Sequence, residues 1–172
     1  LQNYQLPRSK VGLYQAAIDN FSVLWSTRLQ DRSLFPAHLS QVFIAKFLQQ
    51  LAYEAHRRSG PMNELLLREV ITYLLKHFGF TEQQIHNHVK ALLTSIAEEV
   101  GLIIPHGVNT FQFLHRQFQE YLAARDILSK LDNSIEIDGL LHELLHDINW
   151  QEPLRLALEC LCEENPTNAP CQ

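Results

Sequence analysis

The sequence has 172 residues, of which 46% are hydrophobic, and a formal net charge of -5. This apolar content can build a buried core, which excludes a disordered chain, while the acidic balance argues against strong nucleic-acid binding, because phosphates attract clustered Lys and Arg. No apolar run approaches the roughly 18 uninterrupted residues of a membrane span, so we expect a soluble, cytoplasmic protein.

The first two predicted elements are amphipathic helices. Apolar residues recur at helical spacing from Leu13 to Trp25 and again from Phe43 to Ala52, which gives each segment one face to bury. The polar stretch 30–36 separates these helices, and Gly60 with Pro61 ends the second one.

Two further helices follow. The apolar-rich run from Asn63 to His77 predicts a helix with Asn63 as its cap and Gly79 closing it. Thr81 and Gln84 then have the spacing of a capping box, in which each side chain bonds the backbone N–H of the other residue. This box is the clearest helix start in the sequence and predicts a helix that reaches about residue 100.

A β-hairpin and another helix come next. Residues 102–104 are β-prone, residues 105–109 are turn-rich, and residues 110–113 alternate polar with aromatic side chains. Helix formers follow at once, up to a boundary at residues 132–134. Three helices and then a hairpin is the order of a winged-helix unit, here spanning about residues 39–115. The alternative is an irregular helical bundle with one hairpin.

Two last helices are predicted near residues 140–145 and 153–161. The first contains His142, Glu143 and His146, which match H-E-x-x-H, a spacing that places two zinc-binding imidazoles on one helix face beside a glutamate base. Chance placement also explains such a match in a chain with nine His. A zinc peptidase would need a third ligand, which Glu163 or Glu164 could supply. We weigh it against an amphipathic helix that turns three leucines inward: Leu141, Leu144 and Leu145.

A winged helix also suggests DNA binding through its second helix-turn-helix helix, here residues 81–100. That helix carries Glu82, Glu98 and Glu99 against Lys90, so a phosphate-lined groove would repel its net charge. The sequence therefore favours a winged helix that packs against other protein domains over one that reads DNA.

No catalytic set is complete in this chain. A G-x-x-x-x-G-K-[ST] phosphate loop and a G-x-S-x-G nucleophile turn are both absent from the sequence, so the segment alone is not an ATPase or a triad hydrolase. The three cysteines lack the paired C-x-x-C spacing of a zinc ribbon, and we interpret them as idle thiols of a reducing cytoplasm: Cys160, Cys162 and Cys171.

The most specific pattern is F-x-H-x-x-F-Q-E-Y-L-A-A, at residues 113–124. It resembles the stretch that closes the winged-helix domain of the NACHT family, within the signal-transduction ATPases with numerous domains, a class that includes animal innate-immune receptors and bacterial relatives. The flanks, residues 6–25 and 150–161, are similar to the end of the family's first helical domain and the start of its helical repeats, although Lys10 stands where the family has arginine. The resemblance rests on Phe113, His115, Phe118, Gln119 and Glu120.

The resemblance implies a role for His115. In this family the histidine reaches from the winged helix to the β-phosphate of bound ADP and holds the protein closed. The seam between a strand and a helix also suits phosphate on physical grounds, because unpaired N–H groups and the positive end of the helix dipole meet there. The alternative is a capping or packing histidine without a ligand.

The resemblance further implies a longer parent protein, an ATPase whose phosphate loop lies upstream. ADP or ATP with Mg would bind there, and this segment would hold no cofactor itself. Its partner would be the nucleotide-binding domain of the same chain, and the parent would oligomerise on activation. A free-standing winged-helix module for protein interactions remains the alternative function.

The fold expected is mainly α: a helical segment, a winged-helix domain with one β-hairpin, and further helices. We place the end of a first helical domain at residues 1–35, the winged-helix domain with its C-terminal helix at 36–131, and the start of a second helical domain or of helical repeats at 132–172. Because the sequence starts at Leu1 and has a single methionine, Met62, we expect a piece excised from a longer protein.

Overall fold

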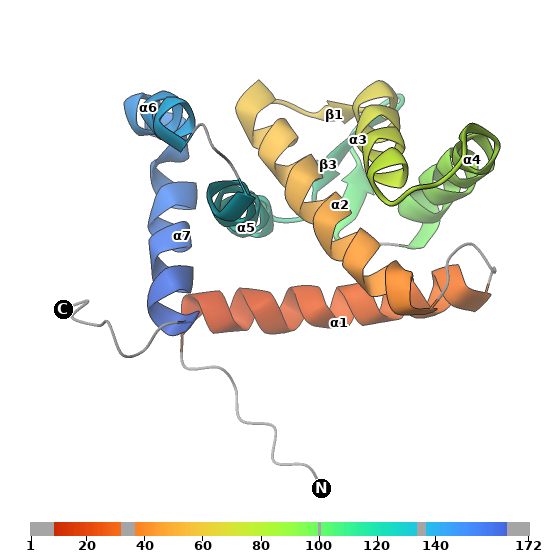
Figure 1. Ribbon diagram of the computed structural model, residues 1–172, viewed down its shortest axis with the longest axis horizontal. Helices are drawn as coiled ribbons and strands as arrows, with labels where there is room; N and C mark the ends of the chain where they lie inside the picture. Colours follow the sequence, from red (N-terminus) through yellow and green to blue (C-terminus); the bar gives the residue numbers. More distant parts are fainter. Residues whose placement is uncertain (1–8, 32–36, 100, 134–136, 165–172) are drawn as a thin grey trace, which may run out of the picture.

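A computed structural model describes residues 9–31, 37–99, 101–133 and 137–164 (Figure 1). The mainly α fold predicted from the sequence is confirmed. The elements in chain order are α1 (Lys10–Asp31), α2 (Ala37–Arg58), β1 (Met62–Asn63), α3 (Glu64–His77), α4 (Glu82–Glu99), β2 (Ile103–Pro105), β3 (Thr110–Phe113), α5 (Arg116–Asn133), α6 (Ile137–His146), the 3-10 turn η1 (Ile148–Trp150) and α7 (Gln151–Glu164).

The segment from α2 to β3 is a winged helix. Its strands form an antiparallel sheet in the order β1-β3-β2, with Met62 opposite Phe111 and Ile103 opposite Phe113. The predicted hairpin is therefore present. The third strand, β1, was not predicted, because two residues are too few to show an alternating pattern.

Local capping sets the starts of two helices where the sequence predicted them. The Asn63 side chain accepts a hydrogen bond of 2.9 Å from the Leu66 N–H at the start of α3. At α4 the Thr81 N–H donates to Gln84 Oε1 at 2.9 Å, and the Gln84 N–H donates to Thr81 Oγ1 at 3.4 Å. Both interactions satisfy N–H groups that the first helical turn leaves without a partner.

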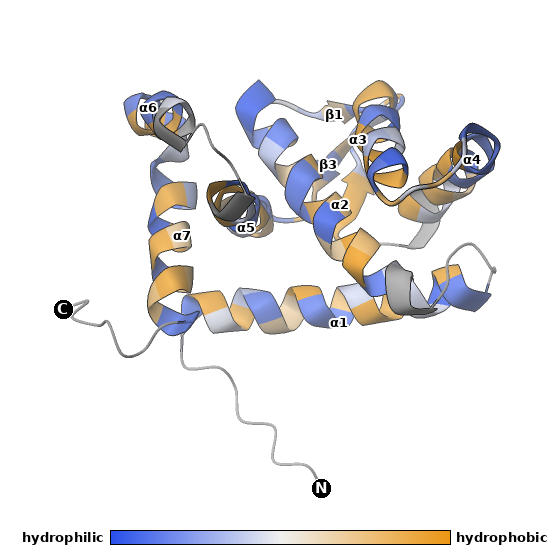
Figure 2. Ribbon diagram, in the orientation of Figure 1, coloured by the Kyte–Doolittle hydropathy of each residue, from blue (hydrophilic) through white to orange (hydrophobic). Residues whose placement is uncertain are grey.

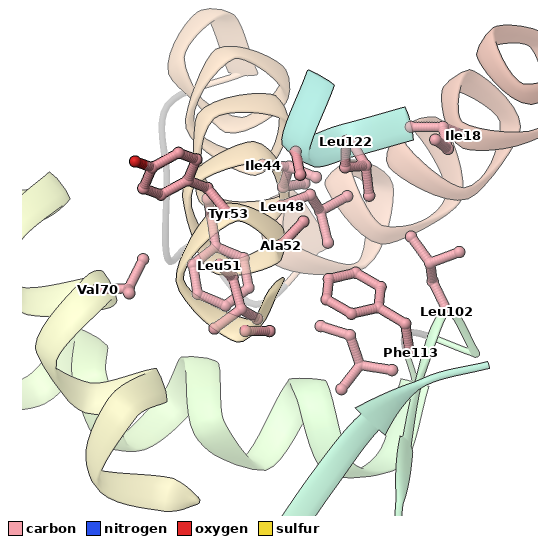
Figure 3. Packing of buried hydrophobic residues seen from close by; sticks show 14 of the residues in the cluster. Ile18, Ile44, Leu48, Leu51, Ala52, Tyr53, Val70, Leu102, Phe113 and Leu122 are labelled. Carbon is pink, nitrogen blue, oxygen red and sulfur yellow. The ribbon is translucent and has the colours of Figure 1, made fainter. Parts of the chain in front are cut away.

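Helix α2 lies at the centre of the core. Figure 3 shows Ile44 and Leu48 of α2 beside Leu122 of α5, with Leu102 and Phe113 on the side of the sheet. Figure 1 shows α1 along the base of the molecule, with α2 rising from it and α7 upright at its other end. Helix α5 fills the space between α2 and α7 and packs against both.

The polarity of the side chains on the outer helices decides which side of each helix is buried. Figure 2 shows α4 hydrophilic on its outer side and apolar toward the rest of the winged helix. On α6, Leu144 is buried and Leu141 half-buried, whereas Leu145 is 67% exposed. The expectation that all three leucines turn inward was therefore wrong for Leu145, because it lies about 100° around the helix from the buried Leu144. None of the described helices is long and apolar enough to cross a membrane.

A buried hydrogen bond ties α1 to the winged helix. The Trp25 indole N–H donates to Ser95 Oγ of α4 at 2.7 Å, and both side chains are buried. The Trp25 ring also meets the edge of Phe47 of α2, with ring centroids 5.7 Å apart. Helix α1 is thus packed into the same core as α2 and α4.

We predict that Ser95→Ala lowers the free energy of unfolding by about 1–3 kcal/mol, because it leaves the buried Trp25 N–H without its acceptor. Urea unfolding followed by circular dichroism measures the change. Thr94→Ala, at the exposed neighbouring position, is the control and should stay within about 0.5 kcal/mol of wild type. Equal losses in the two variants would contradict the assigned role of the hydrogen bond.

Candidate functional site

His115 lies in the two-residue link between β3 and α5. The backbone N–H of the preceding residue, Leu114, donates to the Leu102 carbonyl at 2.8 Å, which continues the hydrogen bonding of the sheet. The His115 carbonyl accepts from the Phe118 N–H at 3.1 Å and the Gln119 N–H at 3.4 Å, which closes the first turn of α5. The backbone of His115 is therefore held on both sides, while its side chain is exposed.

The start of α5 favours an anion. No acidic residue occupies its first turn, so the partial positive charge of the helix end is not offset there. Arg116 adds a guanidinium whose side chain is 72% exposed and whose Nε donates to Glu120 Oε1 at 2.8 Å. His115 and Arg116 thus follow each other in sequence at an exposed helix N-terminus.

One aromatic ring contacts His115 among the residues that the structure describes. The Phe118 ring centroid lies 5.7 Å from that of the imidazole, with the planes inclined at 50°. On its other sides Phe118 meets Tyr14 at 5.8 Å and Phe21 at 6.5 Å, both edge-on and both from α1. The site therefore includes α1, which the sequence pattern did not connect with His115.

The other residues of the motif serve the fold. Phe113 is buried, Phe118 and Gln119 are half-buried, and Glu120 is 8% exposed. Glu120 pairs with Arg116 of the same helix, at 2.8 Å. The i, i+4 spacing brings these two charges together on one helix face.

A hollow of about 520 Å³ borders the same seam. None of the described residues that line it carries a carboxylate, although the chain as a whole is acidic. The sequence did not reveal this hollow, because strand pairing brings the wing beside α5 and the end of α2. His115 is not among its lining residues, which are His56, Ser59, Gly60, Pro61, Met62, His106, Gln112, Phe113, Leu114, Arg116, Gln119 and Asn149.

The structure does not build a zinc site around the H-E-x-x-H match. The His142 and His146 rings stack with centroids 4.2 Å apart, and His146 Nδ1 lies 2.7 Å from the His142 carbonyl oxygen. Within the described ranges no three His, Cys, Asp or Glu side chains converge in a way that could hold a metal ion. Glu164, a candidate third ligand, forms an ion pair with Arg125 instead.

The acidic residues of α4 and the cysteines are two further groups that the sequence singled out. On α4, Glu82 pairs with Lys76 of α3 at 3.1 Å, and the side chains of Glu98 and Glu99 lie outside the described part. Cys160 is buried and Cys162 half-buried, and burial raises the pKa of the Cys160 thiol. Cys171 also lies outside the described residues.

Charged side chains join α1 to α7. Lys10 Nζ lies 3.1 Å from Glu152 Oε1 and 5.7 Å from the centre of the Tyr14 ring. The hydrogen bond from Arg155 is the largest cause that lowers the pKa of Glu152. Burial opposes it, and a hydrogen bond from Lys10 with a smaller effect helps to bring the pKa to about 2. The start of α1 is therefore held at the start of α7 by an ion pair.

We predict that this ion pair weakens in acid. The pKa of Glu152 lies below its ordinary value of 4.5, so its stabilisation is present above that pH and is lost as the pH falls toward 2. Solvent screens the pair, so we expect Glu152→Gln to cost about 1 kcal/mol near neutral pH and almost nothing at about pH 2. Urea unfolding at several pH values measures this, with Glu163→Gln as the control on the same helix; a cost that does not change with pH would contradict it.

We also predict that the purified chain carries no stoichiometric zinc, because two histidines without a third ligand hold zinc weakly. Metal analysis after dialysis, with and without a chelator, measures this. One tightly held zinc per chain, lost in His146→Ala, would overturn the interpretation of α6 as a packing helix.

The comparisons with known proteins bear on the whole winged helix. The sequence matches the family model described as the winged helix-turn-helix domain C-terminal to NACHT over residues 10–127, from the first residue of α1 into α5. No curated protein and no solved structure gives a significant match. The family's description implies association with an upstream NACHT domain of the same chain. Because the match covers more than half of the sequence, the chain belongs to the family of winged helix-turn-helix domains C-terminal to NACHT.

Proposed function

We propose that this chain is the regulatory winged-helix part of a NACHT-type nucleotide-switch ATPase and couples the bound nucleotide, ADP or ATP with Mg, to the packing of the domains. His115 is the residue that senses the nucleotide. The observation that carries this proposal is the exposed imidazole at the N-terminus of α5, where no acidic residue occupies the first helical turn.

The chemistry of the seam fits a phosphate. Backbone N–H groups at a helix N-terminus and the dipole behind them attract oxyanions. An imidazole N–H adds a hydrogen bond, which is charge-assisted when the ring is protonated. A terminal phosphate of a diphosphate, presented by the upstream NACHT domain, would complete this arrangement.

A switch requires that the two nucleotides interact differently with this seam. If His115 bonds the β-phosphate of ADP and loses that bond with ATP, the difference in affinity shifts the equilibrium from the packed to the released position of the winged helix. Release would free the parent protein to oligomerise and signal in the cytoplasm, as in the innate-immune members of its class. Helix α1 would move with the winged helix, because the buried bond between Trp25 and Ser95 joins them.

We predict that His115→Ala in the parent protein raises the ADP dissociation rate about tenfold, the value of one hydrogen bond to a charged group, and raises basal activity. Release of a fluorescent ADP analogue from the purified parent measures the rate. His106→Ala removes another exposed histidine, from the wing, and should leave the rate unchanged.

An unchanged ADP dissociation rate and unchanged autoinhibition in His115→Ala would sink the proposal. His115→Asn, which keeps a side-chain N–H near the same place, should recover part of the slow release. Equal effects of His106→Ala and His115→Ala would point to a general loss of domain packing instead of a lost phosphate contact.

A further inference from the structure

We propose that Phe118 is the positioning residue for His115 and that α1 holds Phe118 in place, so that the position of α1 controls the nucleotide contact. This role rests on the function proposed above for His115. It adds a path by which an upstream domain regulates that contact without touching the histidine.

The first step of this path is the contact between the two rings. An exposed imidazole on a fixed backbone can still rotate about its side-chain bonds. Phe118 lies three residues further on, in the first turn of α5, with its ring centroid 5.7 Å from that of the imidazole. The Phe118 ring excludes the rotamers that would place the imidazole in the volume this ring occupies, and it therefore restricts the directions of the imidazole nitrogens.

The second step is the packing of α1 against Phe118. Tyr14 and Phe21 are seven residues apart, about two helical turns, so they share one face of α1. Both meet Phe118 edge-on, at interplanar angles of 72° and 76°. Edge-to-face pairs of this kind have a preferred geometry, so the Phe118 ring is fixed by where α1 lies.

The third step connects α1 with the other elements. Its end near Trp25 is bonded to α4, and Lys10 at its start is paired with Glu152 of α7. Tyr14 also contacts Tyr121 of α5, whose hydroxyl donates to the Gln15 side chain. The domain of this family lies C-terminal to NACHT, so α1 is the first described helix after the NACHT domain. A movement of the NACHT domain would therefore reach α1 before the other described helices.

The experiment is a double-mutant cycle on ADP release from the parent protein. Phe118→Leu keeps an apolar side chain but removes the ring, and it should raise the ADP dissociation rate by about threefold or more, without exceeding the effect of His115→Ala. In the His115→Ala background the same change should add nothing. Phe118→Tyr, which keeps the ring, should restore slow release.

Two controls separate positioning from loss of stability. Phe78→Leu removes a half-buried ring of the winged helix that packs on Phe43 and not on His115, so it should leave ADP release unchanged. If Phe118→Leu fails to fold by circular dichroism, Tyr14→Leu removes one of the rings from α1. It should give a smaller increase that again disappears in His115→Ala.

A spectroscopic readout works on the 172-residue chain without nucleotide. The carbon-bound imidazole protons of His115 lie in the ring current of Phe118, so Phe118→Leu should shift their NMR signals, whereas Phe78→Leu should not. If the rate effects of Phe118→Leu and His115→Ala multiply in the double variant, or if the His115 signals stay in place, the positioning role is wrong. If His115→Ala leaves ADP release unchanged while the signals do shift, the proposed function fails but the ring contact stands.

Discussion

The burial of α2 is the constraint on which the rest of the structure depends. The apolar side chains of this helix cover more than one narrow stripe of its surface, so a single neighbouring element cannot bury all of them. Helices α5, α1 and α3 all pack against α2, and Figure 3 shows Leu102 and Phe113 on the side of the sheet. Among the described side chains of α2, the apolar residues with no more than 2% of their surface exposed are Phe43, Ile44, Phe47, Leu48, Leu51, Ala52 and Ala55.

That constraint fixes the geometry of the candidate site. Phe113 at the end of β3 is buried in the core, and Leu122 of α5 packs against α2 from the other side. Only Leu114 and His115 connect the two elements, so the chain must turn sharply there. A short link between two packed elements leaves its side chains at the surface, and His115 is therefore exposed at the start of α5 without any flexible loop.

Helix α1 gives the site its connection to the rest of the protein. One face of α1 holds the rings around Phe118, its end near Trp25 is bonded to α4, and its first residue is paired with α7. Packed contacts of this kind have few alternative arrangements, so a small displacement at one end is expressed elsewhere as a change of packing. In the proposed switch, this property lets the nucleotide contact and the domain arrangement influence each other.

The sequence by itself determined the local structure. The helix starts at Asn63 and Thr81 follow from capping side chains within three residues, and the helical spacing and the hairpin depend on near neighbours. The motif around His115 also lies within one short segment, which is why it identified the family and the seam between strand and helix.

Only the tertiary structure decided which distant residues meet. The bond between Trp25 and Ser95 spans 70 positions and the pair of Lys10 with Glu152 spans 142, and no local pattern encodes such partners. The same applies to strand β1 and to the exposure of Leu145. It also applies to His142 and His146, which no third ligand joins among the described residues. The helical periodicity of a sequence predicts that a residue faces the core. Which residues it contacts in the core depends on how whole helices pack against one another.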